Sequence, residues 1–292
     1  MRTLKLLMAA PLFLFFIACE EEGPFINFEE EELDLTLLDT AYISEESESV
    51  QDKNVLLEDF TGVQCINCPS ATRVAEEIVE SREGRVSMLA IHVTETFGSP
   101  MPESREDYRI DEGRRIFTEM LSGTQNLPLG SVDRMLFDDQ NVQKIGFPLW
   151  NGYVNRQLGE VTPVNIHVST QDYDDENRTV ILNTKAFFTQ AVDTEVRLSI
   201  AISESGIIDY QKYPDRVEPN YELNYTLRAM VNGYNGIRLA ESVPQNQVYE
   251  RQYRISLLDN WEAENCNIHV FVHRGSPKFE VYHVQEIPLL PN

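Results

Sequence analysis

Residues 55–70 read VLLEDFTGVQCINCPS, and this stretch decides the fold that the sequence predicts. Its first six residues form a short apolar run of the kind that indicates a buried strand, and Thr61-Gly62 is a turn-prone pair that ends it. Cys65 and Cys68 follow, and residues 70–80 show the apolar spacing of a helix. The two cysteines are therefore expected where a strand passes into a helix.

A cysteine at the start of a helix has distinctive chemistry. Unpaired backbone N–H groups and the helix dipole stabilise a thiolate there and lower the pKa of such a thiol. In this interpretation Cys65 is the attacking thiol and Cys68, one turn later, resolves the mixed disulfide. A CxxC pair is also typical of a structural disulfide or of half a zinc site. No His lies at ligand spacing from the pair, so we expect no metal.

Two further positions suit redox chemistry. Asp59 lies six residues before Cys65, and Leu127-Pro128 lies between a predicted helix and an apolar strand. This arrangement resembles the thioredoxin superfamily, in which a buried acid precedes the first cysteine and a cis-proline faces the pair. The resemblance implies that Asp59 exchanges a proton with Cys68 and that Pro128 presents the backbone of Leu127 to a peptide. Taken singly, Asp59 indicates a surface or capping acid and Pro128 an ordinary turn.

The order of elements predicts an α/β thioredoxin-like domain over residues 53–160. Alternating strands and helices in this order favour a mixed sheet. Strands are expected at 55–60 and 85–93, and a strand or hairpin at 131–137. Helices are expected at 70–80, 107–121 and 139–158, the last interrupted near Pro148.

A closer resemblance rests on several strings together. VLLEDFTG at 55–62 runs into the cysteine pair, LGSVDR occupies 129–134, and residues 225–236 agree as well. These strings resemble the outer membrane protein 28-related lipoproteins over roughly residues 53–289. The resemblance implies an envelope lipoprotein with a thioredoxin-like domain followed by a β domain, and it leaves the biochemical activity open.

The second half, residues 161–292, has the period-two pattern of antiparallel strands with one wet face. Seven such short strands, separated by Asp, Asn, Gly and Pro clusters, predict an all-β immunoglobulin-like sandwich. His167, His269, His273 and His283 are expected to be ordinary strand residues rather than metal ligands, and Cys266 a buried small hydrophobe. The expected strands are 164–168, 179–188, 196–202, 221–230, 248–257, 267–272 and 280–284.

The N-terminus has the features of a targeting signal. Arg2 and Lys5 precede an apolar run that is too short to span a membrane, which is typical of a signal peptide over residues 1–19. Phe16-Ile17-Ala18-Cys19 resembles a lipobox, so Cys19 is the expected lipidation site, with a plain signal peptide as the alternative. Residues 20–52 contain thirteen acidic residues and no Lys or Arg, which indicates an extended acidic tether.

The net charge excludes some classes of binding partner. The formal net charge of −24 makes phosphate backbones poor partners, so no nucleic acid is expected, and the membrane is expected to be contacted only through the lipid anchor. The sequence thus predicts an outer-membrane lipoprotein, facing the periplasm or the cell surface, with no cofactor. One hypothesis is thiol–disulfide exchange with envelope proteins or peptides. The other is a non-catalytic binding or structural lipoprotein with a structural disulfide.

Overall fold

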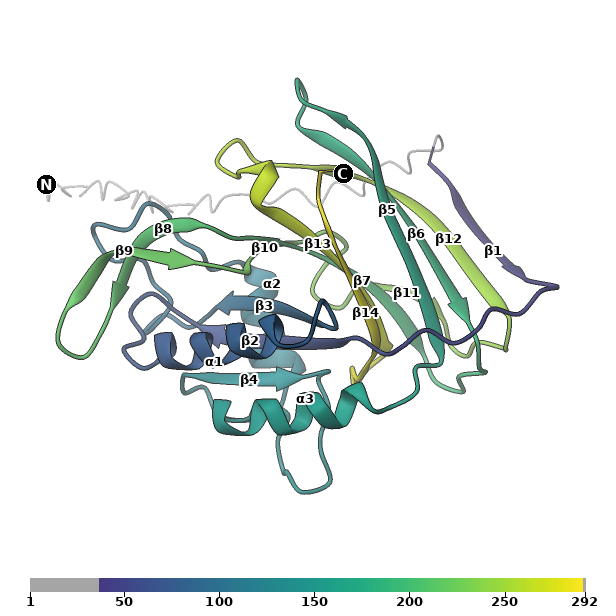
Figure 1. Ribbon diagram of the computed structural model, residues 1–292, viewed down its shortest axis with the longest axis horizontal. Coiled ribbons are helices and arrows are strands. Elements are labelled where there is room, and N and C mark those ends of the chain that lie inside the picture. Colours follow the sequence, from purple (N-terminus) through teal and green to yellow (C-terminus); the bar gives the residue numbers. More distant parts are fainter. Residues whose placement is uncertain (1–36, 291–292) are drawn as a thin grey trace, which may run out of the picture. The chain divides into compact units, whose positions relative to one another are not determined.

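Two sheets dominate the computed structural model, which describes residues 37–290 (Figure 1). Cys19, the signal peptide at 1–19 and the first part of the predicted tether lie outside the described residues. The strands are β1 (Asp39–Ile43), β2 (Val55–Thr61), β3 (Val86–His92), β4 (Leu129–Val132), β5 (Val164–Asp174), β6 (Thr179–Phe188), β7 (Val196–Glu204), β8 (Ile207–Lys212), β9 (Val217–Leu223), β10 (Thr226–Met230), β11 (Ile237–Ala240), β12 (Gln247–Ser256), β13 (Cys266–Arg274) and β14 (Val281–Pro288). The helices are α1 (Cys68–Glu80), α2 (Asp111–Arg115) and α3 (Trp150–Leu158).

The larger sheet joins strands from both halves of the sequence. Within the described residues its order is β14-β13-β7-β10-β3-β2-β4, with β11 paired to β7. β2 and β3 are parallel, and β4 is antiparallel to β2. β10 links the two halves, because Thr226 is in register with Ala90 of β3 on one side and with Glu204 of β7 on the other.

The two faces of this sheet bury different partners. One face packs against α2 and the π-helical segment Ile116–Met120, in a core that includes Leu56, Phe117 and Phe271. At the β2–β3 end, the opposite face packs against α1 and α3. At the β7–β13 end, a core of mostly aliphatic side chains lies between this sheet and the smaller one. The thioredoxin-like assignment for 53–160 and the immunoglobulin-like one for 161–292 stay predictions, and so does their boundary.

The smaller sheet has the order β1-β12-β6-β5, and its outermost strand comes from the predicted tether. β1 pairs antiparallel with β12 through five residue pairs, from Asp39–Arg251 to Ile43–Gln247. From residue 37 onward, then, the segment predicted as an acidic tether is joined to the sheet. Thr40, Tyr42 and Ile43 are residue types that favour a strand, whereas the high acid content of residues 20–52 predicts an extended tether.

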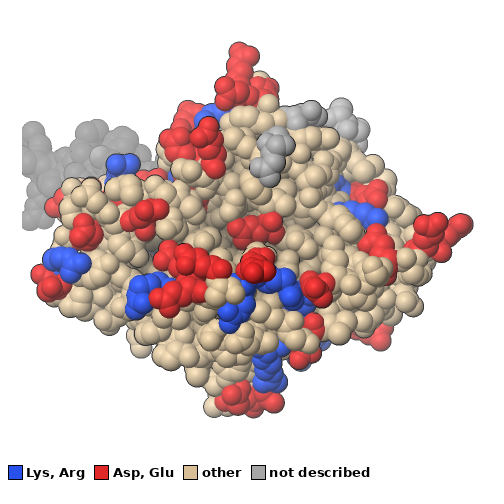
Figure 2. Space-filling view, in the orientation of Figure 1, with Lys and Arg blue, Asp and Glu red and all other residues tan. Residues whose placement is uncertain are grey.

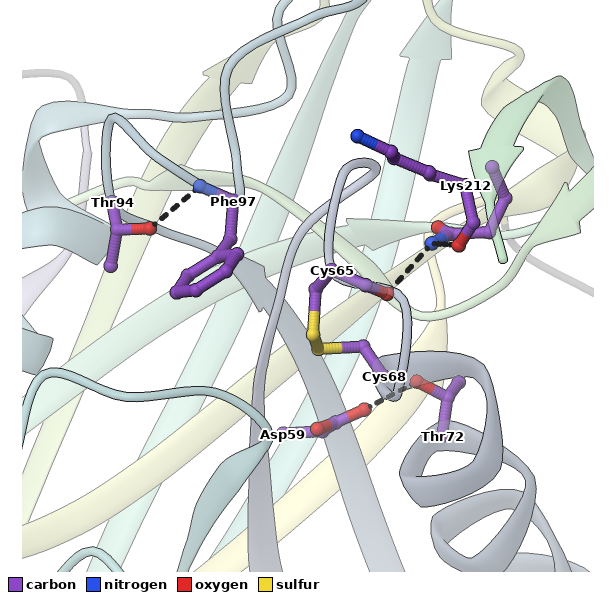
Figure 3. The surroundings of a disulfide bond; sticks show 8 residues. Asp59, Cys65, Cys68, Thr72, Thr94, Phe97 and Lys212 are labelled. Carbon is purple, nitrogen blue, oxygen red and sulfur yellow. Dashed lines mark hydrogen bonds between the residues drawn. A yellow bond between two sulfur atoms is a disulfide. The ribbon is translucent and has the colours of Figure 1, made fainter. Parts of the chain in front are cut away.

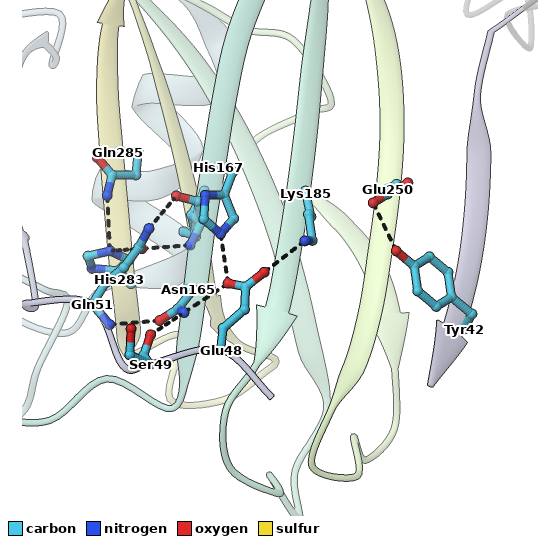
Figure 4. A network of polar contacts seen from close by, with 11 residues as sticks. Tyr42, Glu48, Ser49, Gln51, Asn165, His167, Lys185, Glu250, His283 and Gln285 are labelled. Atoms are coloured by element: carbon cyan, nitrogen blue, oxygen red, sulfur yellow. Dashed lines mark hydrogen bonds and ion pairs between the residues drawn. The ribbon is translucent and has the colours of Figure 1, made fainter. Parts of the chain in front are cut away.

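An ion cluster holds the chain after β1 (Figure 4). The Glu48 carboxylate contacts Lys185 Nζ at 2.7 Å and His167 Nε2 at 2.8 Å, and Asn165 Nδ2 donates to it at 3.0 Å. Burial opposes ionisation of this carboxyl, but the three hydrogen bonds outweigh it and lower the pKa of Glu48 to about 2. The residues before β2 are therefore fixed against β5 and β6.

Two predicted helices are shorter than expected. The helix expected at 107–121 starts at Asp111 and changes to π-helical geometry at Ile116. The helix expected at 139–158 starts only at Trp150, after a 3₁₀ turn over Phe147–Leu149. Pro148 lacks a backbone N–H and restricts the residue before it, so it suits the start of this helix rather than its interior.

Two enclosed ion pairs join β2 and the residues just before it to the segment after β4. Arg134 contacts the Glu58 carboxylate at 2.7 Å, and Lys53 contacts Asp133 at 2.9 Å, with all four side chains buried. Ser131 Oγ also donates to Glu58. Because each buried acid has a cation beside it, neither is left as an isolated charge.

Within residues 37–290, no helix is both long and apolar enough to cross a membrane.

Candidate functional site

The cysteine pair lies at the start of α1, beyond the end of β2. Cys65 and Cys68 form a disulfide, and Cys68 is the first residue of the helix. Cys65 and Cys68 are 2% and 1% exposed, while Ile66 and Asn67 between them are exposed. The sulfur atoms are therefore enclosed, and the tip of the cysteine loop faces solvent.

A hairpin from the second half of the chain covers the disulfide. β8 and β9 pair with each other as a separate two-stranded sheet. Lys212 N donates to the carbonyl of Val63 at 2.8 Å, and Gln211 Nε2 donates to the carbonyl of Cys65 at 3.1 Å. Leu223 of β9 packs against Val63 in a small apolar cluster. Access to the sulfur atoms therefore depends on the position of this hairpin.

The loop after β3 holds the cysteine segment from the other side. The backbone N–H of Gln64 donates to the carbonyl of Phe97 at 2.8 Å, and its side-chain amide donates to the carbonyl of Ser99 at 2.9 Å. Gly62 permits this close approach, because a Cβ atom there would lie 2.3 Å from the Phe97 oxygen. Thr61, predicted as part of a turn, is instead the last residue of β2. Gly62 is required by this packing and starts the turn, because the Cys65 N–H donates to its carbonyl at 2.9 Å.

Asp59 is fully buried beneath the disulfide (Figure 3). Its Oδ2 accepts a hydrogen bond from Thr72 Oγ1 at 2.7 Å, and its Oδ1 has no partner within the described residues. Burial raises the pKa of Asp59 to about 7; the Thr72 hydrogen bond opposes this rise and the charge of Glu76 adds to it. A carboxyl of that kind exchanges a proton readily near neutral pH.

Pro128 lies at the same end of the sheet as the cysteines. The Leu127–Pro128 peptide bond is cis. Because Leu129 is in register with Phe60, the chain enters β4 beside the point where β2 leaves for Cys65. The Leu127 side chain packs against the core, and its backbone makes no hydrogen bond within residues 37–290. That backbone is free to pair with an extended peptide.

A cleft of about 530 Å³ opens near these elements. Its lining includes the apolar residues Val93, Phe97 and Ile110 and the charged residues Asp107 and Arg109. Gln125 also lines it, so the cleft reaches toward the Leu127–Pro128 turn. The cleft is large enough for one or two side chains of a bound peptide.

Sequence comparison identifies the chain's family. The model of the family described as outer membrane protein Omp28 matches residues 121–290, more than half of the chain. The chain belongs to the outer membrane protein Omp28 family. The match includes the Leu127–Pro128 turn and the covering hairpin of this Omp28-family protein, and it begins after the cysteine pair. No curated protein matches the sequence.

Solved structures add a similarity of fold. HBP35 of Porphyromonas gingivalis has a TM-score of 0.65 at 15% identity, over 82% of this chain and 76% of its own. Protein AGR_C_4864 of Agrobacterium tumefaciens has a TM-score of 0.49 at 10% identity, over 84% and 98% of the two chains, which is too low to support an argument. The family name points to the outer membrane, and HBP35 shows a related fold.

Several residues of the site were not identified from the sequence. Thr72, His92, Gln211 and Tyr221 surround Asp59 or the cysteine loop, and they come from α1, β3, β8 and β9. The sequence offered one indication for His92, because this polar residue directly follows the apolar run at residues 88–91. The others could not be assigned because their role depends on which strands become neighbours.

The remaining histidines and Cys266 have ordinary surroundings in this Omp28-family protein. His269 bonds to Ser87 and Ser203, and His273 to Ser199, while His283 accepts from the backbone N–H of Asn54. Within the described residues, no group of three or more His, Cys, Asp or Glu is placed to hold a metal ion. Cys266 is buried and free, as predicted.

Proposed function

We propose that this Omp28-family protein is an outer-membrane lipoprotein, anchored through Cys19, that exchanges thiols and disulfides with envelope proteins or peptides. The observation that supports this proposal most directly is Asp59, a buried carboxyl without a cation partner beside a disulfide at the start of a helix. A disulfide that only stabilises the fold needs no such acid, and burying one without a partner destabilises the protein.

The exchange proceeds by two displacements at sulfur. A substrate thiolate attacks Sγ of Cys65, the Cys65–Cys68 bond breaks, and Sγ of Cys68 leaves with the electron pair. Asp59, protonated near neutral pH, supplies the proton that converts the Cys68 thiolate into a thiol. A second substrate thiolate then attacks the substrate sulfur of the mixed disulfide and releases Cys65. The substrate dithiol is oxidised to a disulfide, the pair is reduced, and the reverse sequence reduces a substrate.

The peptide is held beside the pair. The unpaired backbone of Leu127 before Pro128 accepts an extended segment of substrate, and the neighbouring cleft takes its side chains. The hairpin β8–β9 moves aside to admit the substrate sulfur to Cys65.

The surface charge agrees with a protein partner. Figure 2 shows acidic side chains across the visible face, with Lys and Arg side chains mostly beside them. With a formal net charge of −24, this surface repels nucleic acid, and the substrate is expected to present neutral or basic segments near its cysteines.

Trapping of mixed disulfides at Cys65 tests the proposal. In cells producing Cys68→Ala, Cys65 cannot be released by its partner, so disulfide-linked complexes should accumulate on non-reducing gels. The matched control is the double variant Cys65→Ala, Cys68→Ala, which has no thiol at the site. If Cys68→Ala forms no more complexes than the double variant, the exchange proposal is wrong.

One observation favours the alternative of a non-catalytic envelope protein with a structural disulfide. Both cysteines are almost completely buried beneath β8–β9. A purely structural disulfide is expected to have a reduction potential below about −300 mV, and an exchanging one a higher potential. Equilibration with glutathione buffers measures this potential and separates the two functions.

A further inference from the structure

A small cavity lies behind the disulfide, between the sheet and the covering hairpin. The volume of this cavity is about 10 Å³. That is close to the least volume that holds one water molecule. Its walls come from β2, β3, β10, the first turn of α1 and the hairpin, with Thr61, Ala90, Pro69, Gln211, Tyr221, Leu223 and Asn224 among the lining residues.

Two lining side chains have unsatisfied polar atoms. His92 is 2% exposed, and neither of its ring nitrogens has a hydrogen-bond partner within the described residues. Thr226 is fully buried, and its Oγ1 also has none. Leaving a buried polar group unpaired destabilises a protein, so two such side chains around one cavity require an explanation.

The same cavity reaches Asp59 through Thr72. Thr72 lines the cavity, and its Oγ1 donates to Asp59 Oδ2 at 2.7 Å. A hydroxyl that donates one hydrogen bond retains lone pairs that accept another. A donor in the cavity could therefore extend the Asp59–Thr72 hydrogen bond toward His92.

We propose that this cavity binds one ordered water molecule, which joins His92 and Thr226 to the Thr72–Asp59 pair. This water makes His92 a positioning residue for the proton that Asp59 exchanges with Cys68, a role that rests on the proposed function. The site offers a water two to four polar partners, which is the number a buried water needs.

The charges around the site agree with this arrangement. Burial lowers the pKa of His92 to about 4, Asp107 opposes that shift, and Arg228 adds to it. The ring is therefore neutral at pH 7, with one nitrogen to donate and one to accept. Asp209 on β8 and the ring of Tyr108 also face His92, while Glu76 on α1 and Tyr221 on β9 face Asp59.

A crystal structure of the oxidised protein at a resolution that shows waters tests the site directly. The expected result is a water within hydrogen-bond distance of a His92 nitrogen, Thr226 Oγ1 and Thr72 Oγ1. In His92→Phe the larger apolar ring displaces it. A wild-type cavity without water overturns the proposal, since the ordered water is its central element.

The coupling is tested by NMR titration of the Asp59 carboxyl, again in the oxidised protein. Loss of the water removes a hydrogen bond that favours the carboxylate. In His92→Phe and Thr226→Val, the Asp59 carboxyl should therefore bind its proton roughly threefold more tightly than in the wild type. The matched control is Thr189→Val, which removes a buried hydroxyl that is also unpaired but does not line this cavity. No change in His92→Phe, or an equal change in Thr189→Val, contradicts the coupling.

Both readouts use the oxidised protein and need no exchange reaction, so they remain informative if the proposed function fails. If exchange occurs, the pH profile of its rate should also change in His92→Phe. Its midpoint should move to higher pH by the same amount as the midpoint of the Asp59 titration. A profile that stays in place while the titration moves overturns the positioning role.

Discussion

Asp59 differs from the acids next to it in having no cation. Glu58, the preceding residue, faces Arg134, and Asp133 faces Lys53, so these two buried carboxyls have partners of opposite charge. Asp59 has only the Thr72 hydroxyl. The same strand thus contains one acid that stabilises the fold through an ion pair and one whose ionisation is costly.

The pH dependence of Asp59→Asn follows from this difference. The pKa of Asp59 is about 7 in the folded protein and 3.8 for an ordinary Asp, so folding favours the protonated form. The stability associated with this carboxyl is complete below pH 4 and is lost as the pH rises to about 7. Asn stays neutral throughout, so oxidised Asp59→Asn should match the wild type at pH 4 and be more stable by roughly 4 kcal/mol at pH 8.

Urea unfolding at both pH values measures this effect. Asp138→Asn is the control, because Asp138 is exposed, pairs with Arg156, and has a pKa that this pair lowers. It should show no such gain at pH 8. A stability difference between Asp59→Asn and the wild type that is independent of pH would contradict the assignment.

Among individual residues, the sequence predicted that Cys65, Cys68, Asp59 and Pro128 belong to one site, because they lie close along the chain or at a fixed spacing. The structure places Asp59 beneath the disulfide and Pro128 at the same end of the sheet. His92 and Thr226 were missed, since they reach the site through the pairing of β3 with β2 and β10. No local pattern specifies that pairing.

Among the elements, the β8–β9 hairpin was the least predictable. The sequence predicted one strand over 221–230, and the structure divides it between β9 and β10. Tyr225 has a φ of 56°, in the left-handed region, so the strand is broken there. By contrast, the strand predicted at 179–188 is confirmed as β6, in which buried and partly exposed residues alternate from Thr179 to Ala186.

Gln211 links this hairpin to the disulfide, and its removal should expose the sulfur atoms. Gln211→Ala loses the hydrogen bond to the Cys65 carbonyl, worth about 1 kcal/mol. Opening of the hairpin then becomes about fivefold more frequent, and the disulfide should be reduced by dithiothreitol about fivefold faster. The release of thiols during reduction gives the rate.

Gln247→Ala provides the comparison. Gln247 lies on β12, away from the disulfide, and its side-chain amide donates to the backbone carbonyls of Tyr42 on β1 and Val248 on β12. The disulfide in this variant should be reduced at the wild-type rate. Equal rates in all three proteins would show that the hairpin does not control access to the pair.

Across the whole molecule, one continuous sheet makes the two halves interdependent. The core on one of its faces combines Leu56, Leu89 and Phe117 from the first half with Leu227 and Phe271 from the second. The sequence predicted two domains because its hydrophobic period changes near residue 163. That change marks a different type of element, but it does not reveal which strands share a sheet.

We therefore expect the two halves to unfold together. Trp150, the first residue of α3, lies in the core that α1 and α3 form with the sheet, and Trp261 lies in the core between the sheets, so each reports on one half. In Trp261→Phe and Trp150→Phe, which each retain one tryptophan, urea unfolding followed by fluorescence should give coinciding curves, apart from the shift that each substitution itself causes. Circular dichroism of the same samples supplies that reference. Fluorescence midpoints that depart from the circular dichroism midpoint would indicate independently folding domains.

The attachment of β1 has a mechanical consequence. Tension applied to the chain before residue 37 meets the β1–β12 ladder first and the Glu48 cluster next, and only then β2. With the proposed anchor at Cys19, these contacts would lie between the point of attachment and the disulfide. A pulling force on the anchored chain would then be resisted by the smaller sheet before it reached the Cys65–Cys68 pair.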